Sequence, residues 1–314
     1  MSISALCVAA LSTLCIGAET QPQELIARGR SREAVPLLEA QRDAARKAGR
    51  RDVDAVVTLN NLGSAYYELG RFRDAQRAYE DSLLLRRRLG DGESRDAART
   101  LSNLGAVYLE LRQVAKARST LEQAARALEF QDPDGLPITG VWLNLATAYK
   151  DERRMDEAEA LFRKALAARE RILGSAHRDV AMALNNLGVL LRDRRQLVDA
   201  QALLERAAAA WEHTLGPDHP QVAAGLHNLG VVLAGLELTT RAQECYERAL
   251  RIAEKSLPPD HPNLAAYRTS YAALLGKLGN KKEAKRLEEL ARQGLKRSSS
   301  DNLMGYTVDA RRLR

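Results

Sequence analysis

The sequence predicts an all-α protein built as a solenoid of antiparallel helix pairs, and three observations carry this prediction. Of the 314 residues, 45% are apolar but only 4% are aromatic, so strong helix formers dominate over strand formers. An Asn-Leu-Gly motif recurs at intervals of about 42 residues, and an alanine recurs in phase with it. Within each repeat, apolar residues follow helical spacing twice, which indicates a helical hairpin.

The two markers keep one register along most of the chain. The first marker appears as Asn61-Leu62-Gly63, Asn103-Leu104-Gly105, Asn144-Leu145-Ala146, Asn186-Leu187-Gly188, Asn228-Leu229-Gly230 and, in degenerate form, Ser270-Tyr271-Ala272. The second marker lies twelve residues after each small residue, at Ala75, Ala117, Ala158, Ala200, Ala242 and Ala284. Ala34 extends the second series towards the N-terminus, so a partial repeat is expected before the first complete one.

Residues 1–18 differ from the rest, since Ile3 to Ile16 are nearly all apolar or small. This pattern is typical of a secretory signal cleaved after Ala18, although the usual positive charge at its start is missing. A misassigned start or a short packed helix are the alternatives, and the run is too short for an ordinary membrane span. The expected location is periplasmic or extracellular if the segment is a signal, and cytoplasmic otherwise.

The remaining chain divides at turn signals where Gly follows one helix and Pro begins the next. Pro22 lies where the first repeat would have its small residue, so residues 19–52 are expected to form only a partial repeat. The expected units are 53–94, 95–135, 136–177, 178–219 and 220–261, then a sixth unit at 262–295 that caps the stack, and a basic flexible tail at 296–314.

Small residues at the marker positions are expected to serve packing. Glycine inside a helix costs about 1 kcal/mol relative to alanine, so its recurrence requires a compensating reason. In the first unit, Gly63 and Ala75 are predicted to lie where the two helix backbones approach closely, and a larger side chain would separate the pair.

This register resembles the tetratricopeptide repeat. The Leu-Asn-Asn-Leu-Gly runs at 59–63 and 184–188 and the Leu-Gly-Pro-Asp-His-Pro linker at 215–220 are similar to the kinesin-light-chain subclass. The resemblance covers about residues 30–295 and implies a right-handed superhelix whose first helices line a concave groove. The third unit departs from the pattern, with Ala146 in place of Gly and a different linker at 131–135.

No pattern in the sequence predicts catalysis. Phosphate loops, zinc-protease helices and nucleophile elbows are all absent from it, so neither an enzyme nor a cofactor is expected. The three cysteines provide no disulfide framework and no zinc spacing. His177, His219 and His261 recur at one linker position about one repeat apart, which is too far for a shared metal ion, so we interpret them as structural residues near helix starts.

The best candidates for binding are asparagines on the first helices. An amide both donates and accepts hydrogen bonds, so a row of them suits an extended peptide backbone. Hydrogen bonding of the amides between neighbouring repeats is an equal alternative. Arginines of the same face could hold an acidic side chain or a phosphate. The candidate groove residues are Asn60, Asn61, Tyr67, Arg99, Asn103, Asn144, Lys150, Asn185, Asn186, Arg192, His227 and Asn228.

The sequence therefore predicts a non-catalytic scaffold that binds a protein or peptide partner of unknown identity. A self-assembling module, with a possible homo-oligomer, is the first alternative. The formal net charge of +7 permits a polyanion binder, but basic and acidic residues are interleaved, so nucleic acid is the weaker alternative.

Overall fold

The structure is a computed structural model that describes residues 21–27, 30–133 and 135–301. These residues form fourteen α-helices and no strand. In chain order the helices are α1 (Pro22–Ala27), α2 (Ser31–Lys47), α3 (Val53–Glu68), α4 (Phe72–Arg88), α5 (Arg95–Glu110), α6 (Val114–Gln131), α7 (Leu136–Asp151), α8 (Met155–Leu173), α9 (Arg178–Asp193), α10 (Leu197–Leu215), α11 (Pro220–Gly235), α12 (Thr239–Ser256), α13 (Pro262–Lys277) and α14 (Lys281–Asp301). The predicted all-α solenoid is confirmed.

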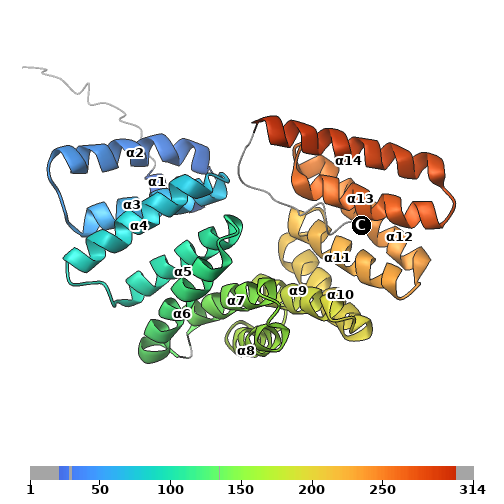
Figure 1. Ribbon diagram of the computed structural model, residues 1–314, viewed down its shortest axis with the longest axis horizontal. Coiled ribbons are helices and arrows are strands. Elements are labelled where there is room, and N and C mark those ends of the chain that lie inside the picture. The colour runs from blue at the N-terminus through green and yellow to red at the C-terminus, as the bar shows by residue number, and fades with distance from the viewer. Residues whose placement is uncertain (1–20, 28–29, 134, 302–314) are drawn as a thin grey trace, which may run out of the picture.

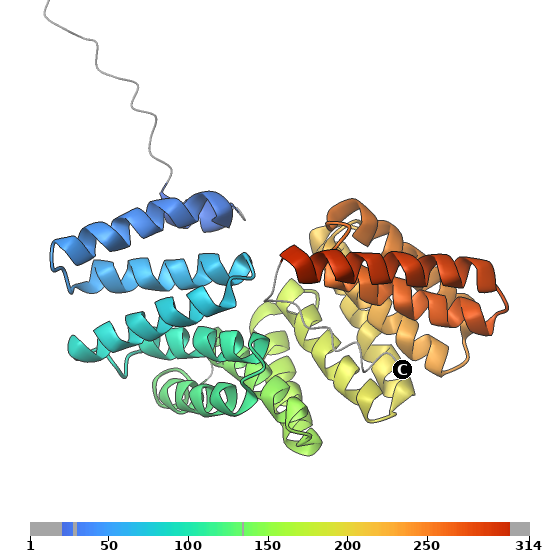
Figure 2. The same cartoon turned by 45° about the horizontal axis from the view of Figure 1, so that its top comes forward.

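The helices stack as consecutive antiparallel pairs that together form an open arch (Figures 1 and 2). Each odd-numbered helix packs against the even-numbered helix that follows it, and each even-numbered helix packs against the next pair. Successive odd-numbered helices also touch one another. In Figure 1, α5, α7, α9 and α11 border the inside of the arch, while α6, α8 and α10 lie outside. The odd-numbered helices are therefore the inner layer.

At each glycine marker, a side chain of the paired helix packs directly against the glycine backbone. A Cβ added at Gly63 would lie 2.5 Å from Cε1 of Tyr79, and one at Gly105 would lie 2.5 Å from Cγ of Leu121. At Gly188 the nearest atom is Cγ of Leu204 at 2.7 Å. The expected close approach is present, but a ring or a leucine fills the space more directly than the opposite backbone does.

The alanine markers are completely buried, as their register requires. Ala75, Ala117, Ala158, Ala200 and Ala242 have no exposed surface, and together with leucines they belong to one hydrophobic core that continues from repeat to repeat. A single hairpin could not bury such a face alone, because its apolar stripe needs the neighbouring repeat as a cover.

The linker histidines begin helices. Nδ1 of His177, His219 and His261 accepts a hydrogen bond at 3.1 Å from the backbone N–H two residues later. Each histidine thus satisfies one of the free N–H groups at the start of α9, α11 or α13, a role that Asp52 and Ser94 perform for α3 and α5. The structural interpretation of these histidines agrees with this geometry.

The turns inside the hairpins repeat one left-handed backbone conformation. The residue at this position has a positive φ in six successive hairpins: Gly70, Arg112, Arg153, Arg195, Glu237 and Gly279. A left-handed conformation is unfavourable for residues that carry a Cβ, so four of these turns store a small strain energy.

At the two ends, the structure differs in detail from the expected boundaries. The short helix α1 begins at Pro22, where a missing N–H costs nothing. Helix α14 continues beyond residue 295 to Asp301, into the segment that was expected to be a flexible tail, because its sequence up to that point contains no helix breaker other than Gly294. The proposed signal, residues 1–18, lies outside the described residues. Among the helices described, none is both long and apolar enough to span a membrane.

Candidate binding face

The twelve residues predicted from the sequence all lie on the inner layer of odd-numbered helices. Arg99 is exposed and the other eleven are partly buried, so none is sealed inside the core. We call the surface that they share the inner face. Their positions keep the repeat register along successive odd-numbered helices.

In the N-terminal part, hydrogen bonds join the inner face from one helix to the next. Thr100 of α5 donates from Oγ1 to Oδ1 of Asn60 on α3, at 3.1 Å. The hydroxyl of Tyr67 lies 3.4 Å from Oε1 of Glu110 across the same pair of helices. Asn103 lies within hydrogen-bonding reach of the hydroxyl of Tyr79, whose pKa is raised to about 12 by burial.

In the C-terminal part, three amides form a short chain. Asn228 on α11 donates from Nδ2 to Oδ1 of Asn185 on α9, at 2.9 Å. Asn185 in turn lies 3.5 Å, Nδ2 to Oδ1, from Asn186. These contacts correspond to the alternative in which amides bond between neighbouring repeats. An asparagine has two donors and two acceptor sites, so each amide keeps hydrogen-bonding capacity after these contacts.

His227 lies beside this chain in a cluster with α13. Its Nε2 is 3.0 Å from Oγ of Ser270, and its ring stacks on that of Tyr267 with centroids 4.5 Å apart. Burial, together with the positive charge of Arg192 on α9, lowers the pKa of His227 to about 4. The imidazole is therefore neutral near pH 7. Arg192 itself is paired with Asp193 at 2.8 Å.

The amide of Asn144 stands apart from these networks. It lies on α7, at the base of the arch (Figure 1), and makes no side-chain hydrogen bond within the part of the chain that is described. In α3, Nδ2 of Asn61 is buried without a hydrogen-bond partner. Arg99 bonds within its own helix to Asp96 at 3.1 Å. Lys150 is partly buried at the C-terminal end of α7.

Sequence reasoning missed Ser270 as a member of this face, and it missed the buried Thr100 and Tyr267, which contact Asn60 and His227 of the face from beneath. Ser270 had a signal, because it occupies the asparagine position of the degenerate sixth motif. Thr100 and Tyr267 carry no repeat marker, and their role depends on the rotation between neighbouring repeats. Within the described ranges, the structure contains no group of three or more His, Cys, Asp or Glu side chains that could hold a metal ion.

Comparison with known proteins agrees with this repeat geometry. The family model described as tetratricopeptide repeat matches residues 25–83, 54–129, 138–200, 179–255 and 226–297. The chain belongs to the tetratricopeptide repeat family. Family members are generally protein-interaction scaffolds rather than enzymes. None of the curated proteins matches the tetratricopeptide chain significantly.

Several solved structures share the fold. BtubC (BKLC) from P. vanneervenii is 22% identical, with a TM-score of 0.60 over 76% of this chain and 96% of that chain. A putative kinesin light chain from Podosopora anserina is 24% identical, with a TM-score of 0.53 over 66% of this chain and 98% of that chain. The Rap protein complexed with Competence and Sporulation Factor is 16% identical, with a TM-score of 0.58 over 89% and 90%. The neighbours thus include the kinesin-light-chain-like proteins that the linker sequences resemble.

Proposed function

We propose that this tetratricopeptide chain is a non-catalytic adaptor that binds an extended segment of a protein partner along its inner face. The observation that carries the proposal is the row of amides on successive odd-numbered helices, which keep unused donors and acceptors. Asn144, at the centre of the row, has all of its hydrogen-bonding capacity available to a ligand. A ligand backbone offers alternating N–H and C=O groups, which amides bind without regard to its side chains.

The hydrogen bonds of the amides support a division between those that serve packing and those that we assign to the ligand. Asn185 and Asn228 hold α9 and α11 together, so their loss is expected to affect stability as well as binding. Asn103, Asn144 and Asn186 do not donate a side-chain hydrogen bond to a neighbouring odd-numbered helix. We therefore assign the larger share of ligand binding to these three amides.

The test begins with capture and cross-linking of partners by the full chain, which yields a peptide segment for synthesis. The triple variant Asn103→Ala, Asn144→Ala and Asn186→Ala should weaken binding of that peptide at least about tenfold, since each lost hydrogen bond contributes about 0.5–1.5 kcal/mol. Its helicity should stay unchanged.

A matched control removes three amides from the even-numbered helices. Gln76, Gln201 and Gln243 each donate to a glutamate four residues later in their own helix and are not among the twelve residues of the inner face. Their replacement by alanine should leave peptide affinity within about twofold. Equal losses in both triple variants, or cross-links that map to the even-numbered helices, would refute binding on the inner face.

A further inference from the structure

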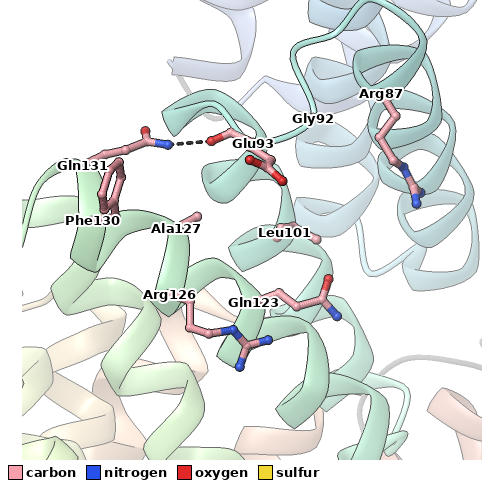
Figure 3. A pocket seen from close by; sticks show the side chains of 9 residues that line it. All are labelled: Arg87, Gly92, Glu93, Leu101, Gln123, Arg126, Ala127, Phe130 and Gln131. Atoms are coloured by element: carbon pink, nitrogen blue, oxygen red, sulfur yellow. Dashed lines mark hydrogen bonds between the residues drawn. The ribbon is translucent and has the colours of Figure 1, made fainter.

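Two pockets on the opposite side of the stack repeat one another. The first furrow, of about 470 Å³, lies between the even-numbered helices α2 and α4 and has Leu59 of α3 at its base. The second furrow, of about 530 Å³, lies between α4 and α6 and has Leu101 of α5 at its base (Figure 3). Neither furrow includes any of the twelve residues of the inner face.

The two furrows are built from equivalent positions. Their bases, Leu59 and Leu101, are 42 residues apart, which is the period of the repeat. The same shift relates further lining residues in pairs: Arg50 with Gly92, Arg51 with Glu93, Asp81 with Gln123, Leu84 with Arg126, Leu85 with Ala127 and Arg88 with Phe130. The furrow is therefore a feature of the backbone stack, and the side chains alone give each copy its chemistry.

The first furrow is strongly basic. Arg42, Arg46, Arg50, Arg51 and Arg88 line it, and Asp81 is the one acidic side chain among its lining residues. Arg42 and Arg50 are paired with Asp43 and Asp52 outside the pocket lining. Arg46, Arg51 and Arg88 form no ion pair with any described residue.

Helix capping explains only part of this charge. Arg46 and Arg88 lie in the last turns of α2 and α4, where a cation complements the helix dipole. Arg50 and Arg51 precede the start of α3, where the dipole disfavours a cation. The pairing with Asp52 and Asp54 accounts for the position of Arg50, whereas the position of Arg51 points to an anionic ligand rather than to helix stability.

Both furrows also present apolar surface to solvent. In the first, the side chain of Leu84 is 45% exposed beside the arginines. In the second, Phe130 is 92% exposed, the largest exposure among the bulky apolar residues described. Figure 3 shows Phe130, Ala127 and Arg126 along one helix, with Arg87 on the facing helix. Exposed apolar side chains beside charged ones are typical of protein interaction sites.

We propose that the two furrows form a second binding surface, independent of the inner face, for an acidic segment of a protein partner that also carries apolar side chains. Its carboxylates meet Arg46, Arg51 and Arg88 through charge-assisted hydrogen bonds. Its apolar side chains rest on Leu84 in the first furrow and on Phe130 in the second. Nucleic acid suits this surface less well, because the first furrow contains no aromatic side chain on which a base could stack.

The test uses a phage-displayed library of random 12-residue peptides as the probe and the full chain as the target. Phage that also bind the double variant Arg46→Gln, Arg88→Gln are removed by counter-selection. The peptides that remain should be rich in Asp and Glu and should carry Leu, Ile or Phe. Measured by fluorescence anisotropy, their affinity should fall at least about tenfold in the double variant and about threefold or more in Phe130→Ala.

A matched control makes the same change of charge at two arginines of α4, the helix that carries Arg88. Arg73 and Arg77 are exposed on α4 and line neither furrow, so Arg73→Gln with Arg77→Gln should change affinity less than about twofold. Circular dichroism confirms that all variants stay folded.

Four results would overturn the proposal. The first is a selection that yields no peptides whose binding depends on Arg46 and Arg88. The second is a set of selected peptides that lack acidic residues. The third is a 12-nucleotide oligouridylate that binds more tightly than the peptides and loses affinity in the double arginine variant, a result that assigns the surface to nucleic acid. Loss of peptide binding in the Asn103, Asn144, Asn186 triple variant would place the peptides on the inner face instead.

Discussion

The ring of Tyr79 covers the backbone of Gly63 so closely that a Cβ at Gly63 would lie 2.5 Å from Cε1 and 2.7 Å from Cδ1 of the ring. The same relationship joins Gly105 to Leu121, Gly188 to Leu204 and Gly230 to Tyr246. In each hairpin, the residue four positions after the buried alanine inserts its side chain over the glycine of the paired helix. This insertion fixes the distance between the two helices.

We therefore expect Gly63→Ala to destabilise the fold. The new methyl group collides with the buried ring of Tyr79, and overpacking of this kind costs about 1–3 kcal/mol. Urea unfolding followed by circular dichroism measures the change. Gly276 provides the control, because it is a helical glycine with no atom within 4 Å of its added Cβ. There the same substitution should stabilise the protein by about 0.5–1 kcal/mol. Equal effects at the two positions would contradict the packing role.

The partly buried imidazole of His227 should make stability depend on pH. Its folded pKa of about 4 lies below the ordinary value of 6.5, so the unfolded chain binds the proton more readily. The contribution of the neutral ring is complete above about pH 6.5 and is lost as the pH falls through about 4. We expect a loss on the order of 2 kcal/mol across this window.

The measurement compares urea midpoints at pH 7 and pH 4.5 for the native chain and for His227→Gln. The variant should lose less stability on acidification. His213→Gln, which removes an exposed histidine of α10, should follow the native profile. Identical profiles for all three proteins would show that His227 does not titrate in this window.

The amide contact between Asn185 and Asn228 should couple two repeats. In a double-mutant cycle with alanine at both positions, we expect a coupling energy of about 0.5–1.5 kcal/mol, typical of one intramolecular hydrogen bond. The pair Asn144 and Asn228, which belongs to repeats that are not adjacent, should show a coupling near zero. A coupling as large for the distant pair would mean that the amides act through a global change of the stack.

The turn at Glu237 offers a stabilising substitution. Its φ of 62° is unfavourable for a residue with a Cβ, so Glu237→Gly should raise the free energy of unfolding by about 0.5–1 kcal/mol after the entropy of glycine is deducted. Glu237→Ala keeps the Cβ and should bring no such gain. Thermal melting of the two variants checks the difference, and a gain with alanine would rule out backbone strain as the cause.

Much of the fold could be predicted from the sequence, because a repeat period reports local geometry directly. The register of Gly63 and Ala75, the hairpin boundaries and the helix starts at His177, His219 and His261 all depend on contacts within one or two repeats. The location of the asparagines on the inner helices follows from the same register.

The finer features depend on the rotation between repeats, which the period does not determine. Whether Asn228 reaches Asn185 is decided by side-chain volumes at the α9–α11 contact, as is the stacking of His227 on Tyr267. The furrows were missed for a related reason: their lining comes from three helices of adjacent repeats. An exposed Phe130 or an unpaired Arg51 leaves no periodic signal.

The restriction of helix contacts to adjacent repeats has a mechanical consequence. The substantial helix contacts join only elements that are one or two apart in the chain, so the contacts that set the separation of the two arms are those between successive repeats. A small rotation at every repeat interface adds up along the arch. Under an applied force, the protein should therefore deform elastically. The distance between the two arms of the arch should increase or decrease while each hairpin stays intact.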